Sequence, residues 1–287
     1  MTTAGIREIR TRIKSVESTG KVTKSMKMVA ASKLRKTQSL MNSFSSYYKE
    51  FDGVLKTVLS AQPSFKNPLV SAKSGNKPLY VLVAGNRGLC GTYNSDLLNY
   101  YGNLVKDETR DYKVLLCGRW LCEMFPENAV HVIERMPSVP DLPDYSFAAS
   151  LADRLKQFYL SGAYDEVIIV CQHYKSALVQ VPVNKRLLPV SFETESPSET
   201  DIIFEPDKDT LINSLVEAYV SNTVYSLLLE AKSGEHVSRM SAMTAASDNT
   251  DELLSQLSLK LNHARQAAIT TEITEIVGGA NSFNTKN

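Results

Sequence analysis

The stretch AGNRGLCGTYN, at residues 84–94, contains the residue types that could cradle a phosphate or attack a carbonyl group. It follows an apolar run and precedes a helical stretch, as phosphate-binding loops do. However, Arg87 takes the place of the second glycine in GxGxxG, and the lysine that GxxxxGK[ST] requires is missing. A tight turn with close strand–helix packing is the better interpretation, and nucleotide binding stays as the alternative.

Cys90 in this loop is a candidate nucleophile, because a cysteine thiolate reacts readily with electrophiles. The sequence offers it no partner, since no Ser/His/Asp or Cys/His set is visible. The four cysteines form no CxxC pair, and the four histidines lack metal-ligand spacing. We therefore expect small buried thiols in a reducing compartment. We predict no catalytic residue, no metal site and no cofactor.

The stretch TGKVTKSMKMVAASKLRK, at residues 19–36, concentrates positive charge, with six lysines or arginines in eighteen positions and no acid. Residues 1–38 have a local balance of +8, although the whole chain carries only +1. Such a segment can be a solvated helix face, neutralise phosphates, or attract acidic protein. It contains no aromatic side chain for stacking on bases, so acidic protein is the better partner.

The basic stretch lies within a long predicted helix that pairs with a second one. Met1 to Gln62 contains no proline, and inward positions alternate steps of three and four from Ile6 to Val58, as in a coiled coil. A second such seam runs from Met240 to Ala268. Neither helix can leave its apolar seam in water, so we predict that the two pair in antiparallel fashion.

Between the two helices the pattern changes to that of a parallel α/β sheet. Strands are predicted at 78–85, 113–118 and 165–174, and helices near 94–106, 119–125 and 145–161. Residues 180–190 are predicted to form an edge strand, because Pro182 and Pro189 do not suit a central one. Residues 191–201 are acidic and are predicted to form a loop.

The predicted fold class is therefore α/β: a long antiparallel two-helix coiled coil from the N- and C-termini plus a central Rossmann-like α/β domain. The expected domains are residues 1–62, 75–195 and 207–285. No apolar run approaches the roughly twenty residues that a bilayer span needs. We therefore predict no direct membrane span, and expect any membrane attachment to go through another protein.

The C-terminal stretch ARQAAITTEITEIVGGANS, at residues 264–282, resembles the hallmark of the gamma subunit of F-type ATP synthases. The residues that match this signature are Ile269, Thr270, Glu272, Glu275, Gly279, Ala280 and Ser282. The basic stretch at 19–36 is similar to the N-terminal helix of the same family, with Val22 and Ser25 as departures. RGLCGTYN and GEHVSRMSAMTAASDN also correspond, in the same order along the chain, with Gly234 as a further departure.

The resemblance implies a non-catalytic central-stalk rotor. Its helix pair would stand inside a ring of three alpha and three beta subunits, and its α/β body would lie beside the epsilon subunit and the membrane c ring. Rotation would couple ion translocation to ATP synthesis or hydrolysis. The implied location is peripheral, on the cytoplasmic face of the bacterial inner membrane.

The resemblance also implies contact residues. Arg239 and Gln266 match positions that hydrogen-bond a loop of one beta subunit. Cations on the first helix are predicted to face carboxylates of the beta subunits, since charge attraction tolerates reorientation. These cations are Lys21, Lys24, Lys27, Lys33, Arg35 and Lys36. Loops including 191–205 are candidates for contact with epsilon and the c ring.

Two other classes remain open from the residues alone. One is a nucleic-acid-binding coiled coil on a Rossmann-like body, which the basic N-terminal segment motivates. The other is a small enzyme that uses the 84–94 loop. The resemblance itself implies that no nucleic acid is bound.

Overall fold

The computed structural model describes residues 3–60, 66–71, 73, 75–176, 179–191, 205 and 207–284, of which 3–4 and 278–284 are described by their backbone alone. The chain divides into two compact units. The first unit contains Met1–Val29 and Met240–Asn287, and the second contains Ala30–Arg239. Two long helices, α1 (Thr3–Ser60) and α5 (Lys208–Asn284), contribute residues to both units.

In the first unit, the beginning of α1 packs antiparallel to the end of α5. Gly20 lies against Thr250, while Thr23 lies against Ser247 with their hydroxyl oxygens 3.0 Å apart, so residue numbers rise along one helix as they fall along the other. A Cβ atom at Gly20 would lie 2.9 Å from Cγ2 of Thr250. The glycine therefore lets the two helix backbones approach closely in the middle of the seam.

The predicted seams are confirmed along both helices. Every seam position from Ile6 to Val58 is buried or partly buried, and so is every seam position from Met240 to Ala268. The helix also continues without interruption through Gly234 and residues 247–250. In a 77-residue helix, the packing of the seam outweighs the roughly 1 kcal/mol by which one glycine lowers helix propensity.

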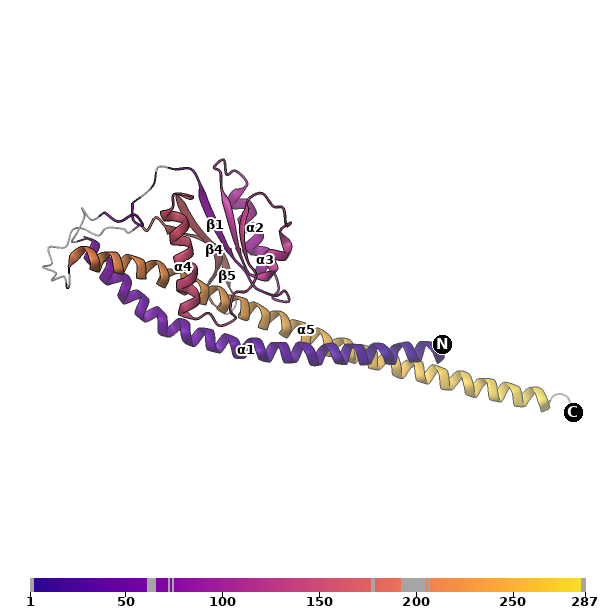
Figure 1. Cartoon of the computed structure of the whole chain (residues 1–287). Helices are drawn as coiled ribbons and strands as arrows, with labels where there is room; N and C mark the ends of the chain where they lie inside the picture. The colour runs from indigo at the N-terminus through magenta and orange to yellow at the C-terminus, as the bar shows by residue number, and fades with distance from the viewer. Residues whose placement is uncertain are drawn as a thin grey trace. The chain divides into compact units, whose positions relative to one another are not determined.

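The second unit is built on a five-stranded sheet with the order β3-β2-β1-β4-β5 (Figure 1). The strands are β1 (Pro78–Val83), β2 (Lys113–Cys117), β3 (Val132–Met136), β4 (Glu166–Tyr174) and β5 (Gln180–Leu188). Pairs among β1 to β4 are parallel, and β5 joins β4 in antiparallel fashion. The helices between them are α2 (Tyr93–Val105), α3 (Arg119–Met124) and α4 (Tyr145–Leu160).

The sequence predicted most of this sheet. The three central strands and the three connecting helices lie where they were expected, and the proline-containing strand is at the edge. The sequence did not predict β3, because this other edge strand is only partly buried and carries Glu134 and Arg135 in place of a continuous apolar run. The predicted acidic loop falls almost entirely outside the described residues, which include only Ser191 of it.

The sheet is covered on both faces, as its continuous apolar strands require. Tyr80 and Leu82 of β1 face the side on which α2 and α3 pack. Leu79 and Val81 face the side of α4 and the parts of α1 and α5 that belong to this unit. There, α1 and α5 again run antiparallel, with the Phe44 ring 4.7 Å from that of Tyr225.

An ion-pair network joins the N-terminal ends of β1 and β4. Arg110 donates hydrogen bonds to Glu108, with Nη2 2.5 Å from Oε2, and to Glu166, with Nη1 2.9 Å from Oε2. Tyr80 donates to the same Glu108 oxygen at 2.9 Å. The hydrogen bonds from Arg110 are the main cause that lowers the pKa of Glu108 to about 2.

We expect this network to make the stability of the folded chain depend on pH in the acidic range. The pKa of Glu108 lies below its ordinary 4.5 in the folded chain, so its stabilisation is complete above pH 4.5 and is lost as the pH falls toward 2. Urea unfolding of the full chain across this range should therefore show Glu108→Gln losing less stability than the unmodified chain. A difference between the two that stayed constant with pH would contradict this assignment.

Candidate functional site

A buried ionic cluster lies on α5 in the second unit and consists of Lys232, Glu235 and Arg239. Lys232 Nζ is 2.8 Å from one carboxylate oxygen of Glu235, and Arg239 Nη2 is 2.8 Å from the other. The three side chains are only 1%, 3% and 13% exposed. Burial alone would raise the pKa of Glu235, but the two cations outweigh it and the pKa is lowered. The carboxylate is therefore ionised in the fold.

The buried ionic cluster is tied to the 84–94 loop. Arg239 Nη2 donates to the carbonyl oxygen of Arg87 at 3.1 Å, and the carbonyl of Gly88 lies 3.4 Å away. A Cβ atom at Gly85 would lie 2.9 Å from Cδ of Glu235, so only glycine allows this approach. Carbonyl groups of the loop thus converge on a cation, whereas a phosphate cradle presents N–H groups.

The loop geometry agrees with the tight turn that the sequence favoured. Gly91 has φ +58°, in the left-handed region that glycine adopts without strain. Asn94 holds the loop by accepting a hydrogen bond from the Gly85 N–H at 3.0 Å. Cys90 is 1% exposed, and burial raises the pKa of its thiol. Burial therefore disfavours the thiolate that a nucleophile would need.

A second polar group packs next to the cluster. His236 donates from Nε2 to the backbone carbonyl of Asp141 at 3.0 Å, and the Asp141 carboxylate forms an ion pair with Lys33 of α1. Burial lowers the pKa of His236, so its ring is neutral. Lys33, predicted to face a partner, therefore has a carboxylate partner in its own chain.

The other cations predicted on α1 differ in their surroundings. Lys24 lies 3.0 Å from Asp251 of α5, in a pair whose side chains are both more than half exposed. The remaining four form no ion pair with any residue that the structure describes. Lys21, Arg35 and Lys36 are exposed, and Lys27 is partly buried. Exposed pairs contribute only about 0–1 kcal/mol, so Lys24 can exchange its partner at little cost.

Arg239 and Gln266 occupy different environments in different units. Arg239 is held inside the second unit by Glu235 and the 84–94 loop. Gln266 is an exposed residue on α5 in the first unit, and its amide side chain has no hydrogen-bond partner among the residues described.

The signature residues lie at the end of α5. Ile269, Thr270, Glu272 and Glu275 are exposed, as is every residue from 269 to 277. The helix continues through Gly279, Ala280 and Ser282, whose side chains lie outside the described part. Ile273 and Ile276, at 55% and 67% exposed, leave this part of α5 with an uncovered apolar surface in the isolated chain.

Reasoning from the sequence missed Lys232, Glu235, His236 and Asp141. Charges at 232, 235 and 239 are spaced three and four apart, which places them on one face of a helix. The preceding run VYSLLLEA is mostly apolar and predicts a largely buried helix, where a charge must have a partner. These two observations together could have identified the cluster.

Among the described residues, no helix combines the length and hydropathy needed to cross a bilayer.

The fold defines the class of protein: a mixed α/β chain in which long N- and C-terminal helices accompany a mainly parallel central sheet. Residues 5–283 match the family model for ATP synthase.

Two curated relatives are ATP synthase gamma chains. The chain is 37% identical over 280 residues to the ATP synthase gamma chain of Desulfitobacterium hafniense, covering 98% of this chain and 99% of the relative. The same identity and coverage hold for the ATP synthase gamma chain of Moorella thermoacetica. This chain therefore belongs to the ATP synthase gamma chain family.

Solved structures share the fold at lower identity. The Euglena gracilis mitochondrial ATP synthase, in its OSCP/F1/c-ring structure, contains a chain that matches with a TM-score of 0.70 and 17% identity, covering 98% of this chain and 95% of that one. The central stalk/c-ring structure from Tetrahymena thermophila matches with a TM-score of 0.58 and 22% identity, covering 79% and 99%. The comparisons give no support to a nucleic-acid-binding protein.

Proposed function

We propose that this chain is the rotor shaft of an F-type ATP synthase and makes or breaks no bond itself. Its family membership supports the proposal. The observation that carries it is the pair of long antiparallel helices, with cations on α1 that form no ion pair with the described residues. Residues 1–62 and 207–285 supply the shaft helices, and 75–195 form the body. Torque from the ion-driven c ring passes along the chain to the catalytic subunits.

The proposed partners are three alpha and three beta subunits around the helix pair, with epsilon and the c ring at the α/β body. The site of action is the cytoplasmic face of the bacterial inner membrane, where the chain is held through its partners. Loops including 191–205 contact epsilon and the c ring in this proposal. Neither nucleic acid nor a cofactor is needed for the role.

Assembly tests the proposal directly. Purification of the chain from its own cells should recover alpha and beta subunits at three copies of each for every copy of this chain. Recovery of the chain alone, or with nucleic acid that dissociates as salt is raised, would contradict the rotor and favour the alternative.

Reversal of unpaired charges on α1 should slow rotation. The variant is Lys21→Glu with Arg35→Glu and Lys36→Glu, and each change replaces attraction to acidic beta surfaces by repulsion. If each reversal costs roughly 0.5–1 kcal/mol, the three together cost about 1.5–3 kcal/mol, and ATP-driven rotation of reconstituted complexes should slow by about ten- to 150-fold. Lys106→Glu, on the exposed end of α2, is the matched control. Unchanged turnover with the triple variant would remove these residues from the contact.

Replacement of Gln266 by alanine should affect coupling without affecting the fold. Its exposed amide has no described partner within the chain, so unfolding of the isolated chain should shift by less than about 0.5 kcal/mol. In the complex, loss of one buried hydrogen bond to a beta loop costs about 1–3 kcal/mol and should weaken assembly or ATP-driven ion pumping. Arg239→Ala is a poorer test, because Arg239 also stabilises the buried ionic cluster. Normal pumping by Gln266→Ala would contradict the assignment.

A further inference from the structure

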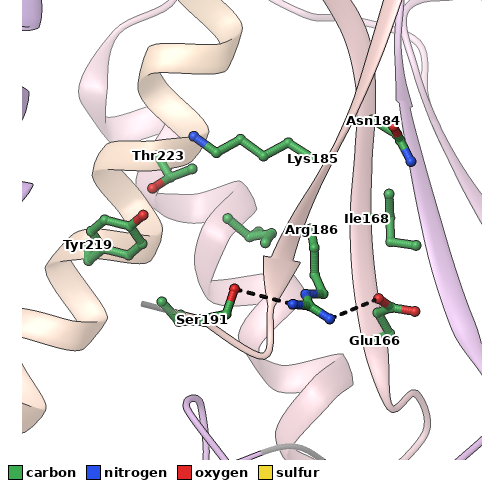
Figure 2. A pocket seen from close by; sticks show the side chains of 10 residues that line it. Glu166, Ile168, Asn184, Lys185, Arg186, Ser191, Tyr219 and Thr223 are labelled. Atoms are coloured by element: carbon green, nitrogen blue, oxygen red, sulfur yellow. Dashed lines mark hydrogen bonds and ion pairs between the residues drawn. The ribbon is translucent and has the colours of Figure 1, made fainter. Parts of the chain in front are cut away.

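A pocket of about 470 Å³ opens beside the outer side of β5 in the second unit (Figure 2). This strand pairs with β4 on one side and with no described strand on the other. The pocket has an apolar lining of Ile168, Leu187 and Val190. Its polar lining is Glu166, Asn184, Lys185, Arg186, Ser191, Tyr219 and Thr223. The volume is in the range that binds ligands or a short run of side chains.

The backbone beside the pocket is suited to accept another strand. The N–H and C=O groups on the outer side of an edge strand form a template for pairing. The register changes from Val167↔Leu188 to Ile168↔Arg186, so Leu187 is an extra residue that forms a bulge. The pocket therefore lies where the edge bends, and an added strand would end there, because a bulge interrupts regular pairing.

Among the described residues, every charged group of the pocket except Lys185 has an ion-pair partner. Arg186 donates to Ser191 at 3.2 Å and lies 3.9 Å from Glu166, which in turn binds Arg110. Lys185 is exposed and forms no ion pair with any residue the structure describes. Figure 2 shows it extending from β5 toward Tyr219 and Thr223 of α5, away from the Arg186 pair.

Lys185 also determines which partner can dock. A lysine on an open edge strand disfavours pairing with neutral strands, because its charge must be desolvated. A strand that carries a carboxylate at the right position removes that penalty. In strand addition, the backbone supplies affinity and the side-chain pockets supply specificity. The unpaired ammonium group next to an open edge therefore selects an acidic extended segment.

We propose that the pocket beside β5 docks an extended acidic peptide segment of another protein, which pairs with the outer edge of β5 and places a carboxylate beside Lys185. This surface is distinct from the cations of α1 and from α5 beyond residue 264. Through Ser191 the pocket adjoins residues 191–205, which the proposed function assigns to epsilon and the c ring. The peptide test is made on the isolated chain, so its outcome does not depend on that assignment.

A pair of synthetic peptides tests the proposal on the full chain. The probe is an acetylated heptapeptide of alternating threonine and valine with one central glutamate. The control peptide has glutamine in place of that glutamate. At low salt and millimolar peptide, the glutamate form should bind about five- to tenfold more tightly. Lys185→Gln should abolish the preference, whereas Lys106→Gln, on the exposed end of α2, should keep it.

Hydrogen exchange gives a second measurement. Bound peptide should slow exchange of backbone amides within residues 183–187 of β5 and leave β3, the opposite edge, unchanged. Equal affinity for the two peptides, no detectable binding, or a preference that survives Lys185→Gln would overturn the proposal. Displacement of the peptide by equimolar acetate or inorganic phosphate would also overturn it, in favour of a small-anion site.

Discussion

Replacement of Glu235 by alanine should destabilise the chain by about 3–5 kcal/mol, because it removes the carboxylate that pairs with two buried cations. Lys232 and Arg239 would then remain in an environment where their side chains are 1% and 13% exposed. The cost of leaving them unpaired exceeds the Coulomb energy of the pairs themselves. Since small domains are stable by roughly 5–15 kcal/mol, this loss is a large part of the total.

The measurement is urea unfolding of the full chain, followed by circular dichroism. Glu123→Ala, at an exposed position of α3, serves as the control and should change stability by no more than about 0.5 kcal/mol. Glu235→Gln keeps the shape and the hydrogen-bond acceptor but removes the charge. Its loss of stability should lie between those of Glu235→Ala and Glu123→Ala. A Glu235→Ala loss below about 1 kcal/mol would mean that water reaches the cluster and that its cations are not buried in solution.

The buried ionic cluster also bears on the rotor role, since a shaft transmits torque only if its helices cannot slip on the body that drives them. Within the second unit, Glu235 and Arg239 connect α5 to the 84–94 loop at the carboxyl end of β1. Paired charges fix the orientation of a helix about its own axis more closely than interchangeable apolar contacts do, because each hydrogen bond has a direction. We therefore expect the Glu235→Ala complex to hydrolyse ATP with weaker coupling to ion movement wherever it still assembles.

The sequence predicted the helices and strands whose residue patterns are periodic or continuously apolar. The alternation of threes and fours over α1 gave the inward face of each residue from Ile6 to Val58, because period alone determines which side of a helix is buried. The three central strands were recognisable as short apolar runs between turn residues. The edge position of β5 followed from the missing N–H of Pro182.

The remaining features depend on contacts between distant segments. The ionic partners of Glu235 lie three and four residues away on the same helix, but its packing against Gly85 joins residues that are 150 positions apart in sequence. Lys33 is predicted to contact a partner subunit, and the sequence does not reveal its intramolecular partner, Asp141, because that residue is 108 positions away. No local pattern reports such pairings, so the candidate cations could be named from the sequence but not sorted into paired and unpaired ones.

Gly118 is another residue whose role cannot be recognised from the sequence. Its replacement is the second change for which we expect a large loss of stability. In the sequence it is one of 13 glycines, with nothing to separate it from the glycine at 102. In the structure it has φ +112° and ψ 135°, a combination that side-chain-bearing residues avoid. A Cβ atom there would lie 2.5 Å from the backbone oxygen of Ala84, between the ends of β1 and β2. The clash is with backbone, so no side-chain rotation can relieve it.

Gly118→Ala should therefore destabilise the chain by about 2–6 kcal/mol, from about 1–3 kcal/mol of backbone strain and a similar cost of overpacking. Gly102→Ala is the matched control, because Gly102 lies within α2 with open space around the added carbon. It should be neutral or stabilising by up to about 1 kcal/mol, since alanine favours the helix. Urea unfolding of both variants compares the two sites directly. Equal stabilities would mean that the sheet ends can separate, and then the 84–94 loop would not hold α5 firmly enough to carry torque.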